Sequence, residues 1–154
     1  MGGNSTLEEF GKNFPSLQFV VLYHQFPSGS NRKSHWDLLV EQPSPEKTQL
    51  LTFEVSAPPQ DWGKATAATQ LPDHRPIYLT YEGPIAGNRG TVSQVLRGAV
   101  QWVTHSEKLL VLNLQFHWKM EEQSPLVLAI VSLTKVTSEN ELDWELRLQV
   151  CSQN

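Results

Sequence analysis

The sequence is poor in cysteine: among 154 residues, Cys151 is the single thiol. One thiol forms no disulfide within the chain, and it rules out a zinc site built from several cysteines. No apolar run approaches the roughly 20 residues of a membrane-spanning helix, and the start of the chain lacks the basic and apolar regions of a secretory signal. We therefore expect a cytoplasmic protein without a membrane partner.

Basic residues are also few. Twelve lysines and arginines stand against sixteen acidic residues, which gives a net charge of −4. This balance disfavours broad, non-specific nucleic-acid binding, because neutralising phosphates requires concentrated positive charge. A local basic site stays open, since several basic residues lie in or beside predicted turns, among them Arg32, Lys33, Arg75 and Arg89.

The chain does contain many short apolar runs, rich in β-branched and aromatic residues and bounded by Pro, Gly, Ser or Asn. We predict strands at residues 17–24, 35–41, 49–55, 76–83, 90–98, 99–105, 108–118, 125–136 and 142–150. Between them, residues 56–76 have room for one short helix at most, within residues 61–70. Eight or nine strands with so little helix predict an all-β sandwich or barrel. Residues 1–15 are expected to be a flexible leader, and residues 16–154 a single domain.

The first polar motif is "HQFPSGSNRKSHWDLLVE", residues 24–41. His35 and Asp37 are two apart in a predicted strand, so they project from the same face. If the strand that ends at His24 pairs with the one that begins at His35, all three side chains share that face. Two imidazoles and a carboxylate suit Mn, Fe(II) or Zn and leave positions open for water and substrate. A hydrogen-bonded or surface histidine is the competing interpretation.

The second polar motif is "LPDHRPIYLTYEGP", residues 71–84. Within it, His74 and Arg75 can hold a phosphate, because Arg offers a fork of donors and His can donate a proton. The competing interpretation is a turn in which Asp73 caps the local backbone and Arg75 is solvated.

The two motifs, in this order, resemble the 3'-phosphoesterase domain of bacterial DNA ligase D, over about residues 17–103. The resemblance implies a compact small β-barrel of about eight strands with one or two short helices at most. It also implies a manganese ion held by His24, His35 and Asp37, with His74 at the reacting phosphate and Tyr78 beside it. Proteins of this family trim a 3'-terminal ribonucleotide and remove the resulting 3'-phosphate.

Several positions depart from the family pattern. The loop between His24 and His35 is longer than the family's. Leu39 stands where the family has an arginine, and a lysine and a second arginine of the family fall near Ala57 and Thr66. The candidates to replace these phosphate contacts are Lys64, Arg75, Arg89, Arg32 and Lys33.

We therefore hold three hypotheses. The first is a 3'-end phosphoesterase that uses Mn²⁺ or another divalent transition metal such as Zn²⁺, acts on nucleic-acid 3' ends and works beside a repair ligase or polymerase. Its catalytic residues would be His74, Tyr78 and Arg75, and its phosphate-binding residues Arg75, Arg89, Arg32 and Lys33. The second is a barrel of the same fold that binds metal, nucleic acid or protein without turnover. The third is an iron oxygenase or cupin, with His117 as the distant ligand of the His-x-Asp pair.

Overall fold

A computed structural model describes residues 17–118 and 123–153, so the predicted leader, residues 1–15, lies outside the described residues. The described residues form nine strands and two 3-10 helices. No helix among these residues is long and apolar enough to span a membrane. The strands are β1 (Gln18–Gln25), β2 (His35–Val40), β3 (Leu50–Val55), β4 (Thr66–His74), β5 (Gly83–Pro84), β6 (Thr91–His105), β7 (Leu109–His117), β8 (Leu126–Lys135) and β9 (Asp143–Gln153). The helices are η1 (Pro59–Asp61) and η2 (Pro76–Leu79).

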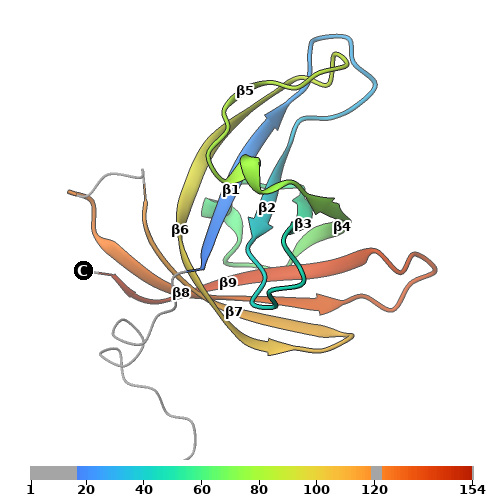
Figure 1. The fold of residues 1–154 in the computed structure, drawn as a ribbon. Helices are drawn as coiled ribbons and strands as arrows, with labels where there is room; N and C mark the ends of the chain where they lie inside the picture. The colour runs from blue at the N-terminus through green and yellow to red at the C-terminus, as the bar shows by residue number, and fades with distance from the viewer. Residues whose placement is uncertain (1–16, 119–122, 154) are drawn as a thin grey trace, which may run out of the picture.

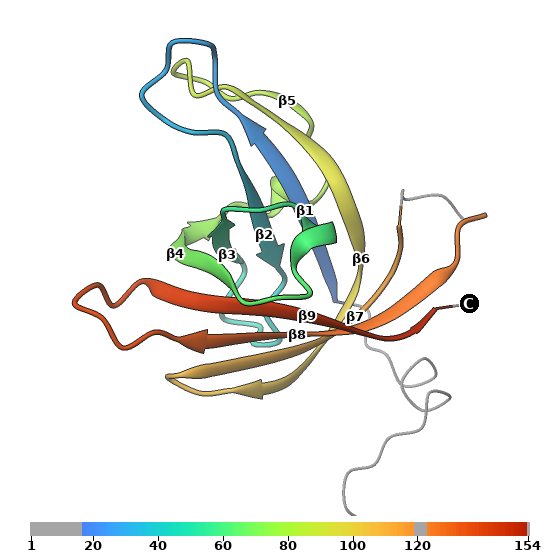
Figure 2. The ribbon, with the colours of Figure 1, turned by 180° about the vertical axis from the view of Figure 1, so that it is seen from behind.

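The strands close into an antiparallel barrel (Figures 1 and 2). Hydrogen bonding runs in the order β1-β2-β3-β4-β9-β8-β7-β6, and β6 pairs back onto β1, so eight of the described strands form the wall. The short β5 pairs only with β6 among the described strands. The prediction of an all-β barrel of about eight strands is therefore confirmed.

The barrel interior is the main hydrophobic core, and the alternation of side chains that builds it is clearest in β7. In β7, four alternate residues are 2 % exposed or less: Leu110, Leu112, Leu114 and Phe116. Their neighbours in the sequence face outward, as residues two apart on a strand must share a face. Trp62, which follows η1, completes the core and is anchored by its indole N–H, which donates to the carbonyl of Ala57 at 2.8 Å.

A second, smaller hydrophobic cluster lies on the outer face of the wall. It contains Val20, Leu22, Leu39, Leu50 and Val92, all buried, although they point away from the barrel interior. Half-buried residues of the segment from η2 to just beyond β5 pack over it, namely Tyr78, Leu79, Tyr81 and Ile85. This outer cover shelters the outer face of β1 and β2.

The middle of the chain has little helix, within the limit of one short helix predicted for residues 56–76. Residues 66–70 belong to β4, where pairing with β3 and β9 outweighs the helix propensity of alanine. The predicted strand at residues 76–83 is wrong, because Pro76 begins the 3-10 helix η2 and the following pairing is limited to Gly83 and Pro84. Proline has no N–H for a sheet.

The predicted strands at residues 90–98 and 99–105 are one continuous strand, β6. Its N-terminal part, residues 91–99, pairs with β1, and its C-terminal part, residues 98–105, pairs with β7. Gly98 lies where these two parts overlap, and an added Cβ there would come within 2.0 Å of the carbonyl oxygen of Gln115. The glycine therefore permits the close approach of backbones that lets one strand serve both halves of the barrel.

Candidate functional site

His24, His35 and Asp37 converge on the outer face of the β1–β2 hairpin. His24 lies directly opposite His35 in the antiparallel register, and Asp37 is opposite Leu22. One ligand atom from each of the three residues lies within 4.8 Å of the others. His35 and Asp37 are 5 % and 2 % exposed, so the group is sheltered rather than dispersed in solvent. The predicted geometry of three side chains on one face is confirmed; that they hold a metal stays a prediction.

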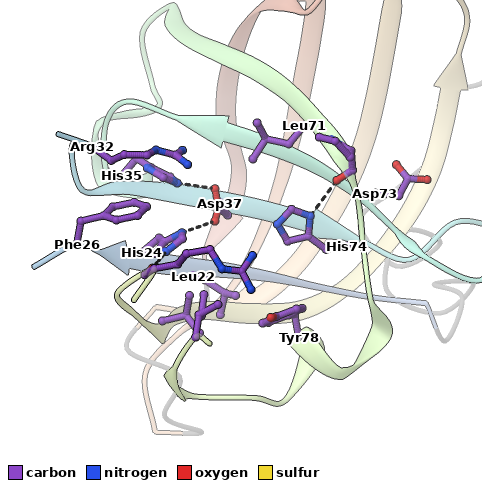
Figure 3. Close-up of a pocket in the computed structure, with 14 residues that line it drawn as sticks. Leu22, His24, Phe26, Arg32, His35, Asp37, Leu71, Asp73, His74 and Tyr78 are labelled. Carbon is purple, nitrogen blue, oxygen red and sulfur yellow. Dashed lines mark hydrogen bonds and ion pairs between the residues drawn. The ribbon is translucent and has the colours of Figure 1, made fainter. Parts of the chain in front are cut away.

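Each histidine of this triad is fixed in orientation by a backbone carbonyl. Nε2 of His24 donates to the carbonyl of Arg89 at 2.7 Å, and Nδ1 of His35 donates to the carbonyl of Lys33 at 3.1 Å. The other ring nitrogen of each histidine is then free to face Asp37 (Figure 3). Metal-binding histidines in proteins usually have such a second hydrogen bond, which fixes the tautomer.

The turn before β6 sets the position of the Arg89 carbonyl. In the sequence "AGNRG", Asn88 has a φ of 57° and Gly90 a φ of 80°. A Cβ at residue 90 would come within 2.0 Å of the carbonyl oxygen of Gln25. Only glycine fits this position, which brings the turn against the end of β1 and so against His24.

The free nitrogens lie beside the carboxylate. Nδ1 of His24 is 3.6 Å from Oδ2 of Asp37, and Nε2 of His35 is 3.1 Å from Oδ1. Two atoms bonded to one cation at about 2.1 Å, with angles of about 90° to 120°, are roughly 3.0 to 3.6 Å apart. Among the described residues, Oδ1 of Asp37 is a buried oxygen without a well-formed hydrogen bond. The donor set, the two distances between histidine and carboxylate and this oxygen all fit a divalent transition metal.

The charges of the triad respond to burial and to one another. Burial disfavours the imidazolium of His35, but the hydrogen bond and charge of Asp37 outweigh it and raise the pKa of His35 above 6.5. Burial also disfavours the Asp37 carboxylate, yet its bonds to His24 and His35 lower its pKa below 3.8. In the metal-free protein the carboxylate therefore favours the protonated form of His35, and a cation that binds Nε2 competes with that proton.

The triad forms the floor of a pocket of 370 Å³ to which the second motif also contributes. Figure 3 shows His74 and Tyr78 on one side of Asp37, and Arg32 and Phe26 on the other. The predicted site residues that line this pocket are His24, His35, Asp37, His74, Tyr78, Arg89 and Arg32. The fold thus brings the two polar motifs together, as their pairing in the sequence implied.

Three predicted site residues are placed elsewhere. Arg75 lines a neighbouring groove, where its guanidinium lies 5.9 Å from the centre of the Tyr78 ring. Lys33 contributes its carbonyl to His35, but its side chain does not line the pocket. His117 also lies outside the pocket and uses Nδ1 to donate to the carbonyl of Ser124 at 2.8 Å. Arg75 and Lys33 therefore lie outside the pocket that holds the triad, and their phosphate contacts stay a prediction. His117 is not part of the triad.

The sequence interpretation missed two residues, Glu54 and Phe26. Oε1 of Glu54 lies 3.6 Å from Nε2 of His35, and Phe26 stacks on His24 with ring centres 4.3 Å apart. The sequence does contain a clue to Glu54, which is a charged residue within the apolar run "LLTFEV". Its place beside the triad follows only from the β2–β3 register, which pairs Asp37 with Glu54.

No protein-family model matches the chain, and no curated protein matches it either. The resemblance to the phosphoesterase domain of DNA ligase D therefore rests on the two motifs. Both motifs line one pocket, and this pocket is the structural basis for the function proposed below.

Proposed function

We propose that the protein is a divalent-metal-dependent phosphoesterase that acts on the 3' ends of nucleic acid, trimming a terminal ribonucleotide or removing a 3'-phosphate in DNA repair. The observation that carries the proposal is the convergence of His24, His35 and Asp37 in one pocket with His74 and Arg89. A metal triad beside a histidine and an arginine suits phosphoester hydrolysis, because it offers a Lewis acid, a proton donor and a phosphate ligand in one pocket.

The metal would be held by Nδ1 of His24, Nε2 of His35 and the carboxylate of Asp37. A divalent cation, when bound, supplies Lewis acidity, polarising a phosphoryl oxygen and making water a stronger acid. Mn²⁺ and Zn²⁺ both suit this mixed nitrogen and oxygen set, which leaves positions open for water and substrate.

The phosphate would be bound by the cationic side chains of the pocket. Arg89 lies in the turn beside His24, where its Nε donates to the carbonyl of Ala86 at 2.7 Å and leaves the terminal nitrogens for an anion. Arg32 also lines the pocket, from the loop between β1 and β2. Arginine forks match the geometry of phosphoryl oxygens.

His74 is the candidate general acid. Its Nδ1 donates to the carbonyl of Pro72 at 2.9 Å, so Nε2 is the nitrogen that can exchange a proton with the substrate. Tyr78 packs edge-on against this ring, with centres 5.8 Å apart, and keeps the imidazole over the pocket. A protonated Nε2 would donate to the leaving oxygen as the phosphoester bond breaks.

The test is hydrolysis of DNA primers that end in a 3'-phosphate or a single 3'-ribonucleotide, with Mn²⁺ or Zn²⁺. We expect His35→Ala and Asp37→Ala to lose activity by about a thousandfold or more, because both remove metal ligands. His105→Ala is the matched control, since this exposed histidine of β6 packs on Trp102 and does not line the pocket. Full activity in the two ligand variants would overturn the proposal.

A second candidate is a barrel of the same fold that binds metal without turnover. The observation in its favour is Leu39, which is fully buried in the outer cluster and offers no charge to a phosphate. Calorimetry that detects tight Zn²⁺ binding, together with no hydrolysis of either primer, would favour this candidate over the enzyme.

A further inference from the structure

Glu54 lies beside the metal triad and has two cationic neighbours. It faces Asp37 across the β2–β3 pairing, and its Oε1 is 3.6 Å from Nε2 of His35. The same Oε1 is 3.6 Å from Nη2 of Arg32. One carboxylate oxygen is therefore shared between a candidate metal ligand and an arginine.

The distance to His35 has a chemical meaning. Nε2 of His35 is the nitrogen that the Lys33 carbonyl leaves free, so it is the atom that would bind a cation. A separation of 3.6 Å is within the roughly 3.0 to 3.6 Å expected of two atoms on one cation. Nε2 of His35 thus has two carboxylate oxygens near it, Oδ1 of Asp37 at 3.1 Å and Oε1 of Glu54 at 3.6 Å.

Arg32 is brought to Glu54 by the long β1–β2 loop. Its guanidinium lies 4.9 Å from the centre of the Phe26 ring, and Phe26 in turn stacks on His24. The backbone N–H of Phe26 donates to Oγ of Ser34 at 3.1 Å, which ties the two ends of the loop together. The Arg32 side chain is 60 % exposed and that of Glu54 is 32 % exposed, so the ion pair between them is weak enough to exchange.

We propose that Glu54 is a switchable fourth protein ligand, which pairs with Arg32 in the metal-free protein and turns to the cation when metal is bound. The inference rests on the metal site of the proposed function. A second carboxylate cancels the remaining charge of a divalent cation that Asp37 alone leaves half compensated. The change also frees the Arg32 guanidinium, which lines the same pocket.

The test is a double-mutant cycle on Zn²⁺ affinity, measured by calorimetry. We expect Glu54→Gln to weaken binding by about tenfold or more, because it removes a ligand. We expect Arg32→Gln to tighten binding by up to about fivefold, because it removes the competitor for the carboxylate. In the Glu54→Gln background, Arg32→Gln should bring no gain, since nothing is left to release.

Simple long-range repulsion between Arg32 and the cation predicts a different pattern. It would make the two substitutions additive, and Lys33→Gln, which removes the same charge from the neighbouring position, would tighten binding as much as Arg32→Gln does. Additive effects, or unchanged affinity in Glu54→Gln, would overturn the role of Glu54. The visible spectrum of the Co²⁺ protein adds a second readout, because the loss of a ligand in Glu54→Gln must change the absorption bands.

The metal site and the role of Glu54 can be refuted separately. If the wild-type protein binds no Zn²⁺, the metal site itself is refuted and Glu54 has no such role. If the wild-type protein binds Zn²⁺ and hydrolyses 3'-phosphates but the cycle is additive, only the role of Glu54 is refuted. Thermal unfolding of each variant checks that the half-exposed substitutions leave the barrel folded.

Discussion

The two candidate metal-binding histidines each donate a hydrogen bond to a main-chain carbonyl, that of Arg89 for His24 and that of Lys33 for His35. A main-chain carbonyl is present whatever side chain stands at residues 33 and 89. Replacing the side chain of Lys33 or Arg89 therefore leaves the orientation of the histidine ring unchanged, whereas moving the backbone at these residues changes it. Gly90 matters more to His24 than the identity of residue 89 does, because its conformation sets that path.

At the scale of single residues, we predict how the free energy of unfolding of the metal-free protein depends on pH through His35 and Asp37. Their contribution should be greatest at mildly acidic pH. The raised pKa of His35 gives stability that is complete below 6.5 and is lost as pH rises through the folded-state value. The lowered pKa of Asp37 gives stability that is present above 3.8 and is lost as pH falls through its folded-state value. The contribution is therefore greatest between 3.8 and 6.5.

Urea unfolding with a chelator present, at a series of pH values, measures this contribution. The charged groups that face His35 are Asp37 and Glu54, with His24 across the strand pair. Asp37→Asn should flatten the dependence at both ends, because it removes the carboxylate on which both shifts rest. A His35 titration in the metal-free wild type at or below pH 6.5, followed by NMR, would contradict the prediction.

Sequence alone was sufficient for His35 and Asp37, because residues two apart on a strand share a face. His24 required one further assumption, that the strands on either side of the loop pair with each other, which the register bears out. The position of Glu54 beside the triad could not be predicted from the sequence. It lies on a third strand, and a slip of one residue in the β2–β3 register would turn it to the other face. Contacts across strands depend on register, which composition does not encode.

At the scale of elements, the segment from η2 to β5 acts as an outer cover for the wall. It packs Tyr78 and Leu79 over the outer cluster, which includes Leu39. Position 39 is therefore a packing position in this protein. The arginine expected there from the family pattern would have no solvent to reach.

We predict that Leu39→Arg destabilises the fold by about 3 kcal/mol or more, because it buries an unpaired charge in an apolar cluster. Urea unfolding measures the loss. Leu39→Met, which conserves volume and polarity, is the control and should cost about 1 kcal/mol or less. If Leu39→Arg kept wild-type stability and gained affinity for phosphate, the outer cluster would be an open phosphate site instead.

The element that sequence predicted least well is β4. Its first half reads "TAAT", and alanine favours helix over strand when no partner is considered. In the structure Thr66 and Ala68 point into the barrel and are buried, while Ala67 between them is exposed. The alternation was present, but small residues make it faint, and the pairing with β3 and β9 decided the outcome.

At the scale of the whole molecule, the metal should act as a stabilising ligand of the folded barrel. A ligand at 100 times its dissociation constant adds about 2.7 kcal/mol to the free energy of unfolding. For a protein of this size that corresponds to a rise in Tm of roughly 5 to 11 °C. We predict a rise of this order with Zn²⁺, measured by calorimetry, and its loss in His35→Ala but not in His105→Ala. An equal rise in all three proteins would mean that Zn²⁺ binds elsewhere.

Side chains along β1 and β2 point alternately into the barrel and to its outer face, so neighbouring residues serve either the core or the pocket. Phe19 and Val21 fill the barrel, while Leu22 and His24 face the outer pocket. Mutations that reshape the interior and mutations that alter the chemistry therefore fall on different codons of the same strands. Such a scaffold can lose, gain or exchange a reaction by changing a few outward side chains, with its architecture inherited unchanged.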